Sequence, residues 1–204
     1  MTKIAVLVSG GGTNLQALLD AQAGGRLTAG KISLVISSKP DAYALKRAEA
    51  AAVPTVVCDR KALGSQEAFE QAIMVALASY GIDMLVLAGF MSILSKSFTD
   101  VWPERIINVH PSLIPSFCGE GYYGLRVHEA ALARGVKVTG ATVHFVNEIP
   151  DGGRIIAQKP VAVKPGDTPE SLQLRVMQEA EWVILPLAVQ AVAEAIAKRK
   201  GGVQ

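Results

Sequence analysis

An amide and an imidazole stand two positions apart, at Asn108 and His110, directly after the short run Arg105-Ile106-Ile107. Alternation along a strand places residues i and i+2 on one side, so both side chains project together. Two prolines, Pro111 and Pro115, stiffen the loop that follows. A hydrogen-bond donor beside a titratable ring is suited to hold a carbonyl oxygen as it gains negative charge. The alternative is a turn whose Asn and His satisfy only backbone groups.

A glycine-rich stretch at residues 10–14 is the second segment suited to chemistry, and it lies between an apolar run and a helical pattern. Glycines let the backbone turn tightly and approach a ligand, and the helix N-terminus offers N–H groups to an anion. Thr13 adds a hydroxyl, so the loop predicts a phosphate site. The alternative is a turn in which Thr13 or Asn14 caps the helix. Leu15 replaces the third glycine of a dinucleotide fingerprint, and the Gly-Lys-Ser/Thr element of a Walker loop is missing.

Three further titratable residues, His128, His144 and Asp151, lie outside these two segments. His128 lies in a helical pattern at residues 124–134 among charged neighbours, which predicts a surface position. His144 lies within a long predicted strand, where a packed or cross-strand position is expected. Asp151 precedes two glycines and is suited to an ordinary turn. A carboxylate beside an imidazole stabilises the charged ring and raises its pKa, but spacing alone does not place Asp151 beside His110.

The elements that must position these residues alternate through the first half of the chain. Apolar runs predict strands at residues 4–8, 32–36, 55–58, 84–88 and 105–109, and helical patterns predict helices at 15–23, 42–51 and 66–80. Such alternation predicts a parallel sheet covered on both faces, with right-handed crossovers. Ligands bind beyond the carboxyl ends of such strands, so the glycine loop and the Asn108–His110 pair would share one edge.

The second half of the chain has a different pattern. Residues 136–146 and 154–163 predict two long strands, antiparallel to each other or extending the sheet edge. A final helix is predicted over residues 169–198, with a kink at Pro186. We therefore predict one domain over residues 1–204. Its class is α/β, with an open, mostly parallel Rossmann-like sheet, helices on both faces and an antiparallel extension in the C-terminal half.

The composition narrows the possible classes of protein. The chain has 204 residues, of which 50% are hydrophobic and 19% charged, as expected for a globular domain with a sizeable core. Net charge is +2, and the basic run at residues 198–200 is typical of a solvated helix end, so no nucleic-acid partner is expected. Cys58 and Cys118 have no metal-like spacing and suggest reduced thiols of a cytoplasmic protein. No apolar segment approaches the roughly 18 residues that span a bilayer.

Four segments taken together resemble the phosphoribosylglycinamide formyltransferases, the folate-dependent enzymes of purine synthesis also called glycinamide ribonucleotide transformylases. They are residues 9–16, 87–91, 108–113 and 151–153. The resemblance extends from Ile4 to about Pro186 and implies the formyltransferase fold. It also implies transfer of a formyl group from 10-formyltetrahydrofolate to the amine of 5'-phosphoribosylglycinamide in de novo purine (IMP) biosynthesis, without a metal, by a monomer or homodimer.

The resemblance assigns roles to three residues of the reaction. Asn108 and His110 would stabilise the tetrahedral oxyanion, and His110 would also donate a proton toward the departing folate nitrogen. Asp151 would raise the pKa of His110 and help to order a water molecule for proton transfer. These roles agree with the chemistry suggested by an amide and an imidazole at one strand end.

The resemblance also assigns residues to the two substrates. The ribonucleotide's phosphate would meet Gly12, Thr13 and Asn14, and its ribose would meet Glu181. The folate would be held by Gln66, Met91, Ser92, Ile93, Leu94 and Asn108. Gln66 stands where many relatives carry an arginine for the folate's glutamate tail, and Arg60 or Lys61 could substitute. Residues 116–124 form a longer loop than in some relatives, and their three glycines suggest an ordered lid near the site.

Other classes of protein fit the sequence less well. A methionyl-tRNA formyltransferase would be expected to carry a further C-terminal domain and a basic RNA-facing surface. A formyltetrahydrofolate deformylase would carry an N-terminal regulatory domain and need no phosphate loop. A non-catalytic nucleotide-binding domain has no use for Asn108, His110 and Asp151 together, although its fold would be the same. Leu15 disfavours an NAD-dependent oxidoreductase.

Overall fold

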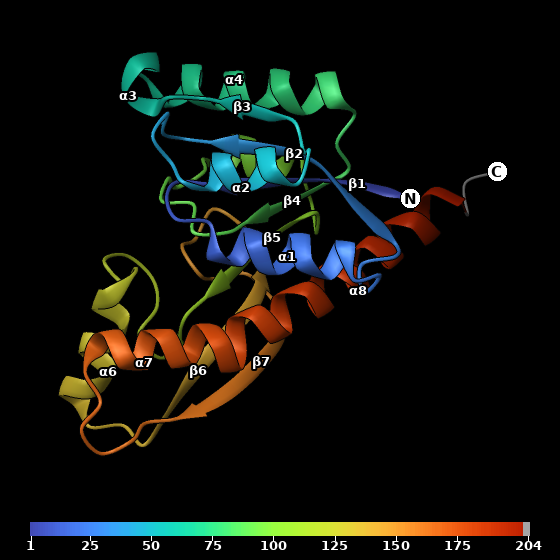
Figure 1. Cartoon of the computed structure of the whole chain (residues 1–204). Coiled ribbons are helices and arrows are strands. Elements are labelled where there is room, and N and C mark those ends of the chain that lie inside the picture. Colours follow the sequence, from blue (N-terminus) through green and yellow to red (C-terminus); the bar gives the residue numbers. More distant parts are fainter. Residues whose placement is uncertain (202–204) are drawn as a thin grey trace.

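The computed structural model describes residues 1–201 and contains a seven-stranded sheet in the order β3-β2-β1-β4-β5-β6-β7 (Figure 1). Five strands are parallel: β1 (Thr2–Val8), β2 (Gly30–Ser37), β3 (Thr55–Val57), β4 (Met84–Leu87) and β5 (Ile106–His110). Two antiparallel strands follow, β6 (Val138–Phe145) and β7 (Ile155–Ala162). The predicted mostly parallel sheet with an antiparallel C-terminal extension is confirmed. The single domain over 1–204 stays a prediction, and its residues 202–204 lie outside the described ones.

Helices connect and cover the strands. They are α1 (Thr13–Ala23), α2 (Ala44–Ala50), α3 (Arg60–Leu63), α4 (Gln66–Tyr80), α5 (Lys96–Asp100), α6 (Leu125–Arg134), α7 (Pro169–Val176) and α8 (Trp182–Gly201). The helices predicted in the first half correspond to α1, α2 and α4. The sequence did not predict α3 and α5, because four or five residues are too few to show a helical period.

Two separate cores lie on the two faces of the sheet. Leu15 and Leu18 of α1 pack with residues of α2 and α8 against one face. Phe69 and Ile73 of α4 pack with residues of α5 against the other. The strands between them are buried on both sides, which is why their sequences are continuous apolar runs rather than alternating patterns. The predicted helices on both faces are confirmed.

Strand β5 is the boundary between the parallel and the antiparallel half of the sheet. It pairs parallel with β4, where Leu87 lies opposite Asn108. It pairs antiparallel with β6, where Asn108 lies opposite His144 and His110 opposite Thr142. The loops that follow β1 and β4 leave the sheet side by side, at the point where the strand order reverses. Open sheets of this kind bind ligands in the crevice at that point.

The C-terminal helical run differs from the prediction of one helix kinked at Pro186. A π-helical segment, η1 (Met177–Glu181), separates α7 from α8, and α8 continues through Pro186. A π segment accommodates one extra residue in a helix and often marks a functional site. By length and composition alone, the run Pro169–Gly201 is long and apolar enough to cross a membrane. The prediction that no apolar segment is long enough to span a bilayer was therefore wrong. Of the most apolar 18-residue window within this run, 56% is buried inside the protein.

Candidate active site

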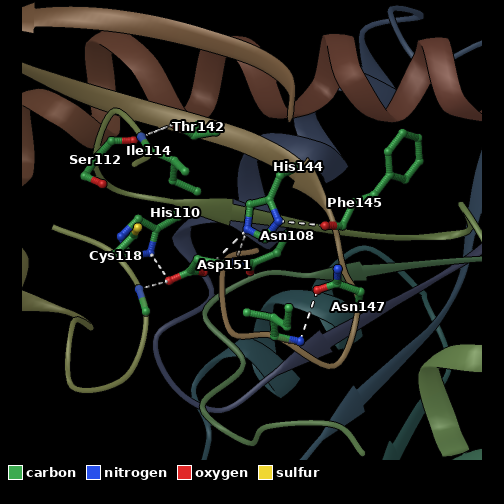
Figure 2. Close-up of polar contacts among 12 residues, drawn as sticks. Asn108, His110, Ser112, Ile114, Cys118, Thr142, His144, Phe145, Asn147 and Asp151 are labelled. Carbon is green, nitrogen blue, oxygen red and sulfur yellow. Dashed lines mark hydrogen bonds and ion pairs between the residues drawn. The ribbon is translucent and has the colours of Figure 1, made fainter. Parts of the chain in front are cut away.

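Asn108 and His110 lie at the carboxyl end of β5 and form a group of four polar side chains with His144 and Asp151 (Figure 2). Asn108 is half-buried, and His110 is 4% exposed. The Nδ1 atom of His110 lies 3.4 Å from Oδ2 of Asp151. Its Nε2 atom lies 2.8 Å from the carbonyl oxygen of Phe117. Because a carbonyl only accepts, this Nε2–H donates to Phe117.

Asp151 reaches the two strands from the link between β6 and β7. Its backbone adopts a left-handed conformation, with φ 56°. Oδ1 lies 3.5 Å from Nε2 of His144, and Oδ2 accepts a hydrogen bond of 2.9 Å from the N–H of Gly119. The structure therefore places Asp151 beside His110, a proximity that sequence spacing could not predict. The hydrogen bond from Gly119 also holds the carboxylate against the loop that follows β5.

His144 is a member of the site that the sequence did not predict as functional. It is the expected cross-strand histidine, since it lies opposite Asn108 in the β5–β6 register. Its Nδ1 lies 2.8 Å from the Phe145 carbonyl oxygen, and its Nε2 lies 3.2 Å from Nδ2 of Asn108. The ring thus orients the Asn108 amide. The available signal was the spacing of Thr142 and His144, two polar residues on one face of the strand.

Burial decides the charge of His110. It lowers the pKa of His110 below its ordinary value, although the carboxylate of Asp151 and the Phe117 carbonyl act in the opposite direction. The expected effect of Asp151, which raises this pKa, is present, but burial outweighs it. Burial also opposes ionisation of Asp151, but His144, His110 and the Gly119 N–H together hold the pKa of Asp151 below its usual range. The free protein thus pairs a carboxylate with a mostly neutral ring at pH 7.

His128 does not lie on the surface as predicted. Its side chain is fully buried, because α6 turns Val127, His128 and Ala131 to the same inward face. Charged neighbours in the sequence suggested exposure, but they occupy the other faces of the helix. Within the described part of the chain, neither ring nitrogen has a hydrogen-bond partner. Burial and the nearby charge of His110 lower the pKa of His128 to about 4.

The glycine loop enters α1 without a side-chain cap. Gly12 is the N-cap residue, with φ 72°, and no side chain accepts from the first turn. The alternative in which Thr13 or Asn14 caps the helix is therefore wrong. A Cβ on Gly12 would lie 2.6 Å from Cβ of Ala44, so the loop packs directly on α2. The N–H groups of the first turn are left for an anion.

Asn14 and Glu181 form a buried pair between α1 and η1. Nδ2 of Asn14 donates to Oε2 of Glu181 over 2.6 Å. Burial raises the pKa of Glu181 to about 7, against the lowering effect of the Asn14 hydrogen bond. The Nδ2 atom of Asn14 is thus engaged by Glu181 of η1.

The residues expected to hold the folate line two neighbouring hollows. Met91, Ser92 and Ile93 share a cavity of about 700 Å³ with Asn108, His110 and Asp151. Gln66, Met91, Ile93 and Leu94 line a second hollow of about 400 Å³, together with Arg60. Nη1 of Arg60 donates to Oε1 of Gln66 over 2.5 Å. An arginine is therefore present beside Gln66, supplied by the unpredicted helix α3.

The loop after β5 lies against His110 and Asp151. Thr142 donates to the Ser112 carbonyl over 2.7 Å, which ties the start of the loop to β6. Glu120, Tyr122 and Tyr123 line the 700 Å³ cavity, and the Phe117 carbonyl occupies Nε2 of His110. Among residues 1–201, no group of three or more His, Cys, Asp or Glu side chains is arranged to hold a metal ion.

Comparison with known proteins places this geometry in a family. Residues 2–189 match the model of the Formyl transferase family. The chain belongs to the formyl transferase family. It is 44% identical over 190 residues to a phosphoribosylglycinamide formyltransferase of Haemophilus influenzae, a match that covers 93% of this chain and 86% of that protein. The resemblance drawn from four segments of the sequence is thereby confirmed.

Structural neighbours and longer relatives agree with this assignment. Glycinamide ribonucleotide transformylase 1 from Symbiobacterium toebii superposes with a TM-score of 0.89 at 44% identity, covering 96% of this chain and 89% of that one. The trifunctional purine biosynthetic protein adenosine-3 of Homo sapiens is 46% identical over 191 residues. That match covers 94% of this chain, which spans only 18% of the length of the human protein. This formyl transferase therefore has the formyltransferase fold and is an enzyme.

Proposed function

We propose that this formyl transferase moves the formyl group of 10-formyltetrahydrofolate onto the amine of 5'-phosphoribosylglycinamide, a step of purine synthesis. The observation that carries the proposal is the pairing of two sites at one edge of the sheet. The Asn108, His110 and Asp151 group follows β5, and an uncapped glycine loop follows β1. A deformylase would need the first site only, whereas a phosphorylated acceptor needs both.

The folate lies in the two hollows beside β4 and β5. A cavity of about 700 Å³ is within the range that binds drug-sized ligands. The pterin contacts the backbone of Met91 to Leu94, and the glutamate tail extends into the second hollow. Arg60, whose guanidinium stacks 5.4 Å from the centroid of the Phe69 ring, supplies the positive charge for the tail in place of Gln66.

The ribonucleotide lies on the opposite side of the crevice. Its phosphate accepts from the backbone N–H groups of Gly12, Thr13 and Asn14, where the helix dipole favours negative charge. Glu181 is 6% exposed and one of its oxygens is held by Asn14, which leaves the other for a ribose hydroxyl. The amine then points toward Asn108 and His110.

The reaction forms one carbon–nitrogen bond and breaks another. The amine attacks the formyl carbon, and Asn108 donates to the resulting oxyanion. Once the substrates replace the Phe117 carbonyl, the neutral ring of His110 carries its proton on Nδ1, toward Asp151, and the free Nε2 takes the proton that the amine nitrogen loses, directly or through an ordered water. Asp151 stabilises the imidazolium, and His110 then gives the proton to the folate nitrogen as the carbon–nitrogen bond to folate breaks. The products are tetrahydrofolate and the formylated ribonucleotide.

The loop after β5 must move away from Nε2 of His110 before this nitrogen can reach the substrates. Nε2 now donates to Phe117, so the bound substrates have to replace that carbonyl. Residues 112–124 would therefore shift when the cavity fills. Deletion of residues 119–123 is expected to change both Michaelis constants, and unchanged constants would contradict this part of the proposal.

One assay tests the whole proposal. The protein is incubated with 10-formyltetrahydrofolate, and tetrahydrofolate release is followed with and without glycinamide ribonucleotide. Release that depends on the ribonucleotide is expected. Release that does not depend on it would point to a deformylase, and no release would point to a binding protein; either result would overturn the proposal.

The setting of the enzyme is also part of the proposal. Both cysteines are free, which suits a reducing, cytoplasmic location. We expect small-molecule substrates only, with no nucleic acid, no membrane and no metal, and a monomer or homodimer.

A further inference from the structure

Arg47 of α2 contacts the glycine loop from outside the predicted phosphate site. Its Nε donates to the carbonyl oxygen of Gly11 over 2.8 Å, and its Nη1 donates to Oε1 of Gln16 over 3.0 Å. The guanidinium also lies 5.1 Å from the centroid of the Tyr43 ring. Two hydrogen bonds and an aromatic ring therefore fix this half-buried side chain beside the loop.

Helix α2 holds two successive carbonyls of the loop. The N–H of Ala44 donates to Gly10 over 3.0 Å, and Arg47 donates to Gly11. In a trans peptide the C=O and N–H groups point in opposite directions. When these two carbonyls point toward α2, the N–H groups of Gly11 and Gly12 must point away from it. They are thereby directed to the open side of the loop, where an anion can bind.

Arg47 also places a positive charge at this loop. Within residues 1–201 it forms no ion pair with a carboxylate, so no neighbouring side chain offsets its charge. It lines a hollow of about 240 Å³ together with Thr13, the first residue of α1. An unpaired guanidinium beside a helix N-terminus adds to the positive potential that the helix dipole produces there.

We propose that Arg47 is a positioning residue for the phosphate monoester of the substrate. It orients the Gly11–Gly12 peptide so that the loop N–H groups converge on the phosphate, and its charge strengthens the binding of the dianion. The inference rests on the proposed function, since it takes the phosphorylated acceptor as given. It adds a residue from α2 to a site that the sequence placed only in residues 12–14 and 181.

The experiment compares Arg47→Ala, Arg47→Lys and a matched control, Lys46→Ala. Lys46 is the neighbouring cation on α2 and lies 5.8 Å from the same Tyr43 ring, but it does not bond to the loop. For each protein, kcat and both Michaelis constants are measured, together with inhibition by inorganic phosphate and the melting temperature.

The expected result is selective for the phosphorylated substrate. Arg47→Ala raises the KM for the ribonucleotide and the inhibition constant of inorganic phosphate by about tenfold or more, the effect of losing a charge-assisted hydrogen bond. The KM for the formyl folate stays within about twofold, because that site does not include α2. Arg47→Lys keeps the charge and recovers part of the affinity, and Lys46→Ala behaves as the wild type.

Two results would overturn the inference. One is a ribonucleotide KM of Arg47→Ala equal to that of Lys46→Ala. The other is a parallel rise of both Michaelis constants with a lower melting temperature, as a purely structural arginine would give. If Arg47→Ala does not fold, Arg47→Gln keeps a donor without the charge and is compared with Arg47→Lys in its place. A wild type without ribonucleotide-dependent transfer would instead contradict the proposed function.

Discussion

The two ends of the crevice are built from different kinds of groups. On the side of β1 and α1, the candidate anion site consists of backbone N–H groups, tight glycine turns and one arginine. On the side of β5 and β6, the candidate catalytic site consists of side chains that bind or release protons. All three histidines of the chain lie on this second side, between positions 110 and 144.

This difference follows from what each site has to do. An anion is held by fixed N–H groups, and one short segment of chain can supply several of them. Proton transfer needs ionisable groups whose pKa values are shifted by burial and by neighbours, and such groups come from separate elements. The first side therefore has to be sensitive to backbone geometry, and the second to charge and pH.

Asn108→Ala should have the largest effect, because it removes the proposed oxyanion donor from the candidate catalytic site. The loss of one such donor costs roughly 3–4 kcal/mol, so kcat should fall by about a hundredfold or more. The KM for the ribonucleotide should change little, since the proposed phosphate site lies on the other side. Asn147→Ala, which removes an amide from the nearby link, serves as the control. Near-normal turnover of Asn108→Ala would remove this residue from the mechanism.

His128→Phe should make the stability of the folded protein less sensitive to acid. The pKa of His128 is about 4 in the folded protein against about 6.5 unfolded. Between these values only the unfolded chain binds the proton. The stability of the wild type is therefore complete above pH 6.5 and falls by about 3 kcal/mol as the pH drops to 4. Urea unfolding at pH 7 and at pH 4.5 measures the loss. An equal loss in His128→Phe would assign the acid sensitivity to other groups.

Gly12→Ala should distort the backbone of the glycine loop. The residue has φ 72°, and the added Cβ would lie 2.6 Å from Ala44. A left-handed non-glycine residue costs roughly 1–3 kcal/mol, so we expect a lower melting temperature and a higher KM for the ribonucleotide. Gly10→Ala is the matched control for stability, since a Cβ there meets nothing within 4 Å. Equal melting temperatures of the two variants would refute the steric account.

Asp151→Asn should change the pH dependence of the reaction. Burial lowers the pKa of His110, and Asp151 partly opposes this shift. Activity that needs a neutral His110 rises as the pH passes upward through that pKa. Without the carboxylate the pKa falls further, so the acidic limb of kcat/KM moves to lower pH. The unsupported imidazolium should also lower kcat by about tenfold. A pH profile that does not move would show that the two residues are not coupled.

His144→Phe should have the smallest effect of the five, because this ring acts through Asn108. Loss of one hydrogen bond to the Asn108 amide costs about 1 kcal/mol, or several-fold in kcat. His144→Gln can accept the same hydrogen bond and should recover part of the activity. If the glutamine variant is no better than the phenylalanine variant, orientation of Asn108 is not the function of His144.

The sequence predicted the strands and the longer helices of the parallel half of the molecule. Buried strands are continuous apolar runs, and the helix over residues 66–80 matched α4 at both ends. The glycine loop could be recognised as a candidate anion site because it consists of consecutive residues. The short helix α3 escaped prediction, and with it the position of Arg60 beside Gln66.

The charge and surroundings of the histidines were decided only by the tertiary structure. His128 was expected on the surface, and packing of α6 buries it. His144 joins the site because the antiparallel register places it opposite Asn108, and register is not encoded by the pattern of one strand.

The sequence by itself determined the order of strands along the chain, the glycine loop and the Asn-x-His end of β5, because local steric preferences and side-chain alternation fix these features. The tertiary structure decided which groups surround that pair: Asp151 returns from the β6–β7 link, and α2 brings Arg47 to the loop. It also decided that His110 is mostly neutral. The physical reason is that desolvation and charge depend on distances between segments far apart in the chain.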